Sequence, residues 1–356
     1  MAFAFVGSNP TPCTIFMIDK FKQYIDTAER ILITSHISPD PDATASVLLL
    51  GTTLQLNFPD KKIRMVLEEK PEGLDFLNGY DQLIFSNITQ NIEQFKPDLI
   101  ILVDANSFER CSRHDGQQAR EYALKNRVKT AIIDHHEPDG KDKVDCYLNS
   151  GNPATVQEVY ELCFNEMNLK KPQGYAVTTM LGLYADTGGF TYDNPRYAQT
   201  FKLAAELIAA GAVIEEIKNH LNQYSGDQMK VISELANNVT GEAGYSYSFI
   251  NDEFVENWQR SGKPLASLHM ATKPFLDEYI RNIDGRKWGF LVYLDLLDGE
   301  HTYSVSLRSL GGVKDVSKIA TKFSGGGHRP AAGGKVQANN VEEAIEKVKA
   351  AIKSES

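Results

Sequence analysis

The residues from Ser35 to Ser46, SHISPDPDATAS, bring one imidazole and two carboxylates together in a short segment. The side chains of His36, Asp40 and Asp42 are ligands that hard or borderline divalent cations accept. The two prolines in the segment restrict the backbone, which reduces the entropy lost when ligands are held in place. The alternative is that Asp40 or Asp42 caps the following helix and that the histidine is incidental. This segment alone leaves both interpretations open.

Acidic residues and histidines recur after two further apolar runs. Asp104 follows the run DLIILV, and Asp134, His135 and His136 follow the run TAII. Two adjacent histidines after a buried strand point in different directions, so one can bind a metal while the other meets a substrate. The alternatives are a turn or capping role for Asp104 and a simple hydrogen-bonded role for one histidine.

Short apolar runs alternate with segments of helical spacing through the first part of the chain. This alternation predicts an α/β fold, a doubly wound parallel sheet with helices on both faces. Ligands of such sheets bind beyond the carboxyl ends of the strands. Asp186, which stands before paired glycines, is either a turn residue or one more ligand. The strands are expected at 31–34, 62–67, 98–103 and 130–133, and the helices at 19–29, 43–56, 116–125, 154–169 and 175–184.

The second part of the chain predicts a smaller α+β domain at 241–356. A helical connector is expected at 215–240, after a first domain that spans 1–214. Residues 1–17 are expected to form a loose extension, in which either Met1 or Met17 is the functional start. The elements expected after the connector are a strand at 245–250, a helix at 264–280, a hairpin of 287–295 with 301–308, a helix at 316–323, a strand at 335–337 and a helix at 341–352.

A glycine-rich segment lies inside this second domain. The backbone N–H groups of Gly325, Gly326 and Gly327 can form a concave site for an anion, and Arg308 and His328 would add cationic donors for phosphate. The alternative is a flexible linker. A linker is the weaker interpretation, because the segment stands between a helix and a run of small residues in a packed domain.

The composition of the 356 residues is that of a globular chain, with 42% hydrophobic and 24% charged residues. A net charge of -10 argues against long duplex nucleic acid held mainly by phosphate contacts, whereas a small anionic substrate at a local metal site stays open. The four cysteines lack CxxC spacing, which indicates reduced thiols in a cytoplasm. No apolar run has the length of a membrane span, so no membrane partner is expected.

Six side chains are expected at the strand ends of one sheet, and four of them are carboxylates. Four carboxylates balance the charge of two divalent cations, and a pair of cations that shares one carboxylate is suited to in-line hydrolysis at phosphorus. Imidazole and carboxylate ligands without a thiolate favour Mn²⁺ or Mg²⁺, with Co²⁺ or Zn²⁺ as alternatives. The six expected ligands are His36, Asp40, Asp42, Asp104, His135 and Asp186.

The motifs together resemble those of the DHH phosphoesterase superfamily and of its DHH-associated C-terminal domain. The first four are His36-Ile-Ser-Pro-Asp40-Pro-Asp42, the isolated Asp104, Asp134-His135-His136 and Asp186-Thr-Gly188. The C-terminal ones are Ser306-Leu-Arg308-Ser309 and Gly325-Gly-Gly-His328. The resemblance covers almost the whole chain except the N-terminal extension.

The resemblance implies a role for each position. His36, Asp40 and Asp104 would hold one metal, and Asp42, Asp104, His135 and Asp186 would hold the other, with Asp104 as the bridge. His136 would face the scissile phosphate, and Asp134 would orient its neighbours. The implied substrate-binding residues are Arg308, Gly325, Gly326, Gly327 and His328.

Within the superfamily, the two-domain organisation is similar to that of the stand-alone nano-RNases. The first hypothesis is therefore a manganese-dependent hydrolase of short oligoribonucleotides and of adenosine 3′,5′-bisphosphate. A phosphodiesterase acting on cyclic-di-AMP or linear dinucleotides is the alternative enzyme, and a nucleotide-binding regulator with an inactive metal site is the alternative outside enzymes. The expected partners are short single-stranded RNA or mono- and dinucleotide phosphates, and a homodimer is left open.

Overall fold

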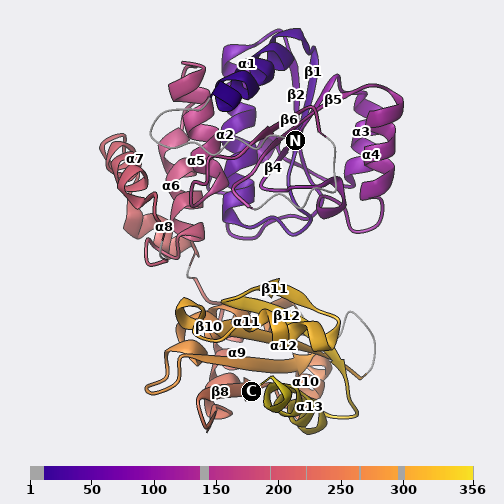
Figure 1. The fold of residues 1–356 in the computed structure, drawn as a ribbon, viewed down its shortest axis with the longest axis vertical. Coiled ribbons are helices and arrows are strands. Elements are labelled where there is room, and N and C mark those ends of the chain that lie inside the picture. Colours follow the sequence, from indigo (N-terminus) through magenta and orange to yellow (C-terminus); the bar gives the residue numbers. More distant parts are fainter. Residues whose placement is uncertain are drawn as a thin grey trace. The chain divides into compact units, whose positions relative to one another are not determined.

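The computed structural model describes residues 12–136, 144–192, 194–221, 223–263, 266–295 and 301–355. The chain divides into two compact units, Met1–Gln223 and Tyr224–Ser356 (Figure 1). The boundary falls inside the expected connector at 215–240. The helices on either side of it, α8 (Ile214–Leu221) and α9 (Gly226–Asn237), therefore belong to different units.

The first unit contains a six-stranded parallel sheet, which confirms the expected doubly wound fold. The strand order is β3-β2-β1-β4-β5-β6, so the order reverses between β1 and β4. Ligands of doubly wound sheets bind at such a reversal. The strands are β1 (Arg30–Thr34), β2 (Lys62–Leu67), β3 (Ile84–Phe85), β4 (Leu99–Val103), β5 (Lys129–Ile133) and β6 (Cys146–Leu148).

Helices cover both faces of this sheet. Successive residues of a strand point to opposite sides, so each strand packs against helices on both faces. Ile31 and Ile33 pack with one group of helices, and Leu32 packs with the other. The first group consists of α1 (Pro12–Thr27), α2 (Pro41–Asn57), α5 (Thr155–Tyr160), α6 (Tyr175–Asp186) and α7 (Tyr197–Ala209), together with α8. The second group is α3 (Ile88–Phe95) and α4 (Gly116–Lys125), which lie together in Figure 1.

Two expectations for the first unit are corrected. The first helix begins at Pro12 instead of Asp19, so residues 12–17 are not a loose extension. Proline suits the first turn of a helix, and the buried Phe21 and Ile25 hold the helix against the sheet. The helix expected at 154–169 is α-helical only to Tyr160 and continues as a π-helix over Glu161–Glu166.

The second unit contains a mixed six-stranded sheet with the order β11-β12-β10-β9-β8-β7, in which only β8 and β9 pair in parallel. This confirms the expected smaller α+β domain. The strands are β7 (Thr240–Glu242), β8 (Tyr245–Phe249), β9 (Trp288–Leu294), β10 (Thr302–Ser309), β11 (Gly326–His328) and β12 (Ala331–Gln337).

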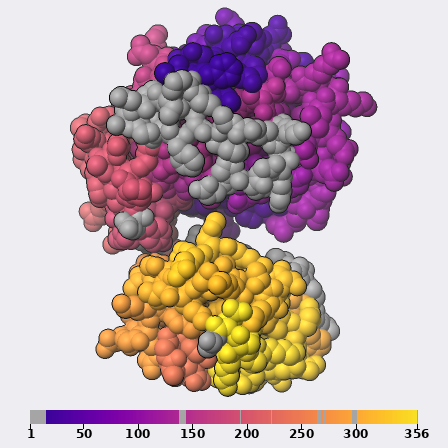
Figure 2. Space-filling model, in the orientation of Figure 1, coloured from indigo at the N-terminus to yellow at the C-terminus, as the bar shows by residue number. Residues whose placement is uncertain are grey.

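The second unit has two hydrophobic cores, and a separate group of helices packs against each of them. One core packs against α12 (Ser317–Ala320) and α13 (Val341–Ser354), and the other against α9, α10 (Asp252–Arg260) and α11 (Ala266–Glu278). Figure 2 shows α13, in yellow, at the surface of this unit. Short 3₁₀ turns occur across the chain at Tyr80–Gln82, Phe108–Arg110, Ile280–Asn282, Leu310–Gly312 and Thr321–Phe323.

Three features of the second unit differ from the sequence expectations or lie beyond them. Helix α10 was not predicted, and the last strand begins at Ala331 instead of Lys335. The glycine-rich segment is not a loop, because Gly326–His328 pairs with β12. The turn of the expected hairpin lies outside the described residues.

In the described part of the chain, none of the helices combines the length and apolar character that crossing a bilayer requires.

Candidate active site

Three neighbouring strands of the first sheet carry the expected ligands at their carboxyl ends. His36 lies two residues after β1, Asp104 directly follows β4, and His135 comes shortly after β5. Because β1 and β4 flank the reversal in strand order, these side chains converge where the fold leaves room for a ligand. Asp186 reaches the same place from the last residue of α6.

The N-terminus of α2 explains the two carboxylates of the first motif. Asp40 caps the helix, since its Oδ1 accepts a hydrogen bond of 3.0 Å from the backbone N–H of Ala43. The same Oδ1 lies 4.0 Å from Nε2 of His36, so capping does not remove Asp40 from the site. Asp42 lies in the first helical turn and is fully buried.

The structure brings all six expected ligands together. One cluster contains His36, Asp40 and Asp104, and a second contains Asp42, His135 and Asp186, while His136 lies close to Asp104 and His135. Within each cluster, one donor atom per residue lies within 4.8 Å of the others. The separation of 3.1 Å between Nε2 of His135 and Oδ2 of Asp186 is the shortest ion-pair distance in the second cluster.

Asp104 lies between the two clusters. Its Oδ2 is 3.5 Å from Nε2 of His36, and its Oδ1 is 3.7 Å from Nε2 of His135. One oxygen of the carboxylate therefore faces each cluster, as a bridging ligand requires. The Asp104 backbone has a φ of 54°, in the left-handed region that few residues other than glycine adopt. Backbone strain of this kind is typical of functional sites.

Asp42 is held by the N-terminus of α5. Its Oδ2 accepts a 2.6 Å hydrogen bond from the N–H of Thr155, and its Oδ1 accepts a 3.0 Å bond from the N–H of Val156. Gly182 of α6 makes room for this carboxylate, because a Cβ at that position would lie 2.6 Å from Asp42 Oδ1. The sequence patterns singled out neither Thr155 nor Gly182.

His136 is oriented by its neighbour Asp134. The buried carboxylate of Asp134 lies 2.8 Å from Nδ1 of His136 and also accepts a 3.1 Å bond from its backbone N–H. A carboxylate acceptor keeps the proton on Nδ1, so Nε2 of His136 is the nitrogen available to a ligand. The His136 side chain is 31% exposed, twice the 15% of His135. The roles expected of the two histidines stay a prediction.

The electrostatics of the site indicate an excess of negative charge. Burial and the charges of Asp186 and Asp104 raise the pKa of Asp42 well above its usual value. Burial opposes ionisation of His135, but the nearby carboxylates of Asp186 and Asp104 raise its pKa to about 10. For Asp104, burial is outweighed by the hydrogen bond to His36 and by the charges of the three histidines, which lower its pKa to about 2.

The donor set fits divalent cations. Oxygen and imidazole donors without thiolates suit Mn²⁺ and similar ions, and bound cations would neutralise the clustered carboxylates. Metal binding would also replace protons on His135, because only the neutral imidazole is a ligand. The bound cations would then balance the negative charge of the buried carboxylates.

The second unit holds the expected substrate-binding residues. Arg308 donates from Nε to Oδ1 of Asp277 over 2.9 Å, and both side chains are 18% exposed. Gly326, Gly327 and His328 are exposed on β11, at the edge of the sheet. The flexible-linker interpretation of this segment is wrong, because β11 is hydrogen-bonded to β12.

The neighbouring strand β12 lies so close that glycine is required both within β11 and directly before it. A Cβ on Gly325 would lie 2.0 Å from the carbonyl oxygen of Gly333. Gly327 has a φ of 139°, and its Cβ would lie 2.6 Å from the carbonyl oxygen of Ala331. A hollow of about 590 Å³ beside this strand is lined by Gly325 and by residues of β10 and β12.

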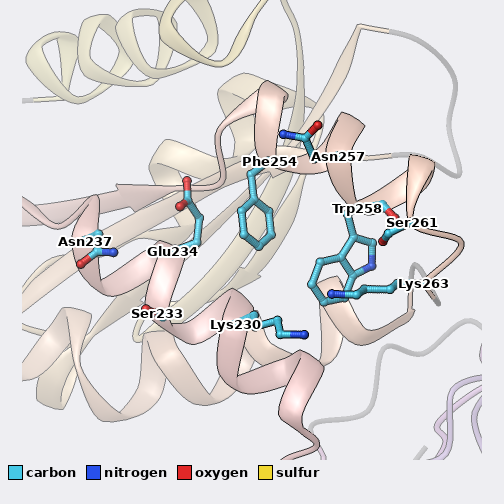
Figure 3. Close-up of a pocket in the computed structure, with 9 residues that line it drawn as sticks. All are labelled: Lys230, Ser233, Glu234, Asn237, Phe254, Asn257, Trp258, Ser261 and Lys263. Atoms are coloured by element: carbon cyan, nitrogen blue, oxygen red, sulfur yellow. Dashed lines mark hydrogen bonds between the residues drawn. The ribbon is translucent and has the colours of Figure 1, made fainter.

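Another pocket of the second unit, of about 400 Å³, lies between α9 and α10 and contains none of the expected residues (Figure 3). Phe254 and Trp258 stack in it with ring centroids 5.7 Å apart, and Nζ of Lys263 lies 4.4 Å from the Trp258 ring. Lys230 and Lys263 both pair with Asp227, at 3.1 and 3.2 Å. Their charge is therefore partly compensated.

Comparisons with known proteins agree with this architecture. Residues 30–184 match the DHH family, N-terminal domain, and residues 264–354 match the DHHA1 domain. The chain is 27% identical over 316 residues to the bifunctional oligoribonuclease and PAP phosphatase NrnA of Bacillus subtilis (strain 168), which covers 88% of this chain and 91% of that protein. The protein of the same name from Thermus thermophilus is 25% identical over 332 residues, covering 91% of this chain and 90% of that protein.

A solved structure shows the same fold. The exopolyphosphatase-related protein of Bacteroides fragilis superposes with a TM-score of 0.78 at 22% identity, covering 95% of this chain and 96% of that one. The two domain matches lie in the two compact units, and the strand-end clusters lie in the first of them. The chain therefore contains a DHH domain followed by a DHHA1 domain.

Proposed function

We propose that the protein hydrolyses short oligoribonucleotides and removes the 3′-phosphate from adenosine 3′,5′-bisphosphate. The observation that carries the proposal is the grouping of six candidate ligand residues into two clusters, with Asp104 close to a histidine of each. The names of the Bacillus and Thermus relatives, which align over most of the chain, support this substrate class. The net charge of -10 favours short substrates, because a long polyanion would be repelled by most of the surface.

The proposed cofactors are two divalent cations, with Mn²⁺ as the first choice and Mg²⁺ or Co²⁺ as alternatives. His36, Asp40 and Asp104 would hold one cation. Asp42, His135 and Asp186 would hold the other, with Asp104 shared between the two. When bound, the cations supply an acidified water and neutralise charge on the phosphate.

The protein side chains around the cations have separate tasks. His136, with its Nδ1 proton held by Asp134, presents Nε2 to the scissile phosphate. There it would stabilise the developing charge or, when protonated, donate a proton to the leaving oxygen. Asp134 would keep the imidazole in the productive orientation.

We also propose that the second unit supplies substrate contacts. Arg308 donates from Nε to Asp277 and from Nη1 to the carbonyl oxygen of Leu307, and its other N–H groups suit a second phosphate of the substrate. The exposed backbone of Gly325, Gly326 and Gly327 and the side chain of His328 would bind the same phosphate or the nucleoside. The buried thiols of Cys111, Cys146 and Cys163 support a cytoplasmic location, where thiols stay reduced.

The test is hydrolysis by the full chain in the presence of Mn²⁺. Short RNA of two to five nucleotides, adenosine 3′,5′-bisphosphate, cyclic-di-AMP and pyrophosphate would be compared as substrates by chromatography of the products. We expect hydrolysis of the first two, and loss of that hydrolysis in Asp104→Asn to the level of the buffer. Faster hydrolysis of cyclic-di-AMP than of short RNA would favour the dinucleotide phosphodiesterase instead. A parent protein that binds nucleotide but hydrolyses none of the four substrates would favour the regulator.

A further inference from the structure

Thr155, the first residue of α5, connects side chains of both ligand clusters. Its hydroxyl donates a 2.8 Å hydrogen bond to Oδ1 of Asp104, and it accepts a 3.3 Å bond from the backbone N–H of His135. Its backbone N–H binds Oδ2 of Asp42. One fully buried residue therefore contacts three of the six ligand residues, which come from the ends of β4 and β5 and from the first turn of α2.

We infer that Thr155 is a positioning residue for the metal centre, and that its hydroxyl sets the orientation of the shared carboxylate Asp104. The inference rests on the proposed two-metal function. A threonine hydroxyl has one proton, and here that proton is committed to Asp104. Oδ1 of Asp104 is therefore held in the direction of His135, while Oδ2 remains directed to His36.

The surroundings make this hydroxyl hard to replace. Thr155 has no exposed surface, so no bulk water can substitute for the hydroxyl at Asp104 or at the His135 N–H. A buried polar group that loses its partner retains its full desolvation penalty. Groups that orient metal ligands in this way typically change metal affinity or activity by about 10- to 100-fold when they are removed.

The substitution Thr155→Val removes the hydroxyl and keeps the shape and the backbone N–H to Asp42. We expect the affinity for Mn²⁺, measured on the full chain by isothermal titration calorimetry, to fall by about 10- to 100-fold. Thr155→Ser retains the hydroxyl and should stay within about threefold of the parent. Because Thr155 touches ligand residues and not substrate, kcat should fall in Thr155→Val with little change in KM.

Thr200→Val is the matched control. Thr200 is also fully buried, and its hydroxyl donates a 2.9 Å hydrogen bond to Oε1 of Gln157 on the same helix α5. This control should lose thermal stability without loss of Mn²⁺ affinity. If Thr155→Val does not fold, Thr155→Ala provides the same comparison with a smaller side chain.

The outcomes separate this inference from the proposed function. Unchanged Mn²⁺ affinity in Thr155→Val or Thr155→Ala would overturn the positioning role, and so would an equal loss in Thr155→Ser. A parent that binds Mn²⁺ but hydrolyses no phosphate ester would overturn the proposed function alone, because the affinity comparison still tests Thr155. A parent that binds none of Mn²⁺, Mg²⁺ and Co²⁺ would overturn both.

Discussion

The position of the Asp42 carboxylate in the candidate site depends on a few close contacts. Its two oxygens are bound by the N–H groups of Thr155 and Val156, and the third side of the carboxylate faces Gly182. No side-chain carbon fits there, since a Cβ would be 2.6 Å from Oδ1 and 2.8 Å from Cγ1 of Val156. Gly182 therefore has a steric role that its place inside an ordinary helical pattern does not reveal.

We predict that Gly182→Ala destabilises the protein by about 1–3 kcal/mol and weakens Mn²⁺ binding, because the added methyl group displaces Asp42. Urea denaturation and calorimetry would measure the two effects. Gly226→Ala is the control, because no atom lies within 4 Å of its Cβ position. This control should be neutral or slightly stabilising. A Gly182→Ala protein with parental metal affinity would show that Asp42 is not a ligand.

Arg308 allows substrate binding to be separated from metal binding. We predict that Arg308→Ala raises KM for short RNA by about 10- to 100-fold, which corresponds to the loss of a charge-assisted hydrogen bond. The bound metal, measured by elemental analysis, should not change. Arg286→Ala is the control, since Nε of Arg286 donates to the backbone oxygen of Glu242. Metal loss in Arg308→Ala would contradict the separate roles of the two units.

At the scale of elements, the strand ends were the most predictable feature. Aliphatic runs such as 99–103 form buried strands. A polar residue directly after such a run must lie at the carboxyl end of its strand. That reasoning placed His36, Asp104 and His135 near one another. It could not supply the distances between them, because these depend on strand order and on how α2, α5 and α6 pack.

Several of the elements missed from the sequence are short strands specified by tertiary contacts. Strands β3 and β6 have two and three residues, too few for a periodic pattern. Strand β11 is largely glycine, which has little intrinsic strand preference, and it forms because β12 lies beside it. Thr155 was missed for a similar reason, since nothing in the sequence shows that its hydroxyl faces Asp104.

Helix α5 contains one carboxyl group, Glu158, and its burial has a consequence for stability. Glu158 accepts hydrogen bonds from the N–H groups of Ser150 and Asn152, and burial raises its pKa from 4.5 to about 7. The folded state therefore favours the protonated form. Its stabilising contribution is fully present below pH 4.5 and is lost as the pH rises through 7.

We predict that Glu158→Gln removes this pH dependence, because glutamine keeps the acceptor oxygen and cannot ionise. Relative to the parent, the variant should gain on the order of 3 kcal/mol between acidic and mildly alkaline pH. Urea denaturation of both metal-free proteins at about pH 5 and pH 8 would measure the difference. The same pH dependence in both proteins would show that Glu158 does not titrate in this range.

At the scale of the whole molecule, the described core residues form clusters confined to one unit or the other. The clusters of the first unit lie between Ile18 and Ile217, and those of the second between Val231 and Ile352. Two domains were already expected from the order of the elements along the chain. The sequence placed a helical connector between them, whereas the structure assigns α8 to the first unit and α9 to the second.

We predict that residues 224–356 fold when produced alone, because that segment carries both of its hydrophobic clusters. The expected result is a single cooperative thermal transition, measured by circular dichroism, without phosphoesterase activity. A segment without cooperative unfolding would show that its cores need the first unit.

The left-handed backbone at Asp104 limits which substitutions can remove its charge without distorting the chain. Asparagine is one of the few residues that adopts a φ near 54° readily, whereas alanine or a β-branched replacement would have to bend the chain at the end of β4. An alanine variant would thus report on a distorted strand end as well as on a missing charge. Asparagine removes the charge alone, which makes it the replacement suited to trapping an intact substrate for crystallography.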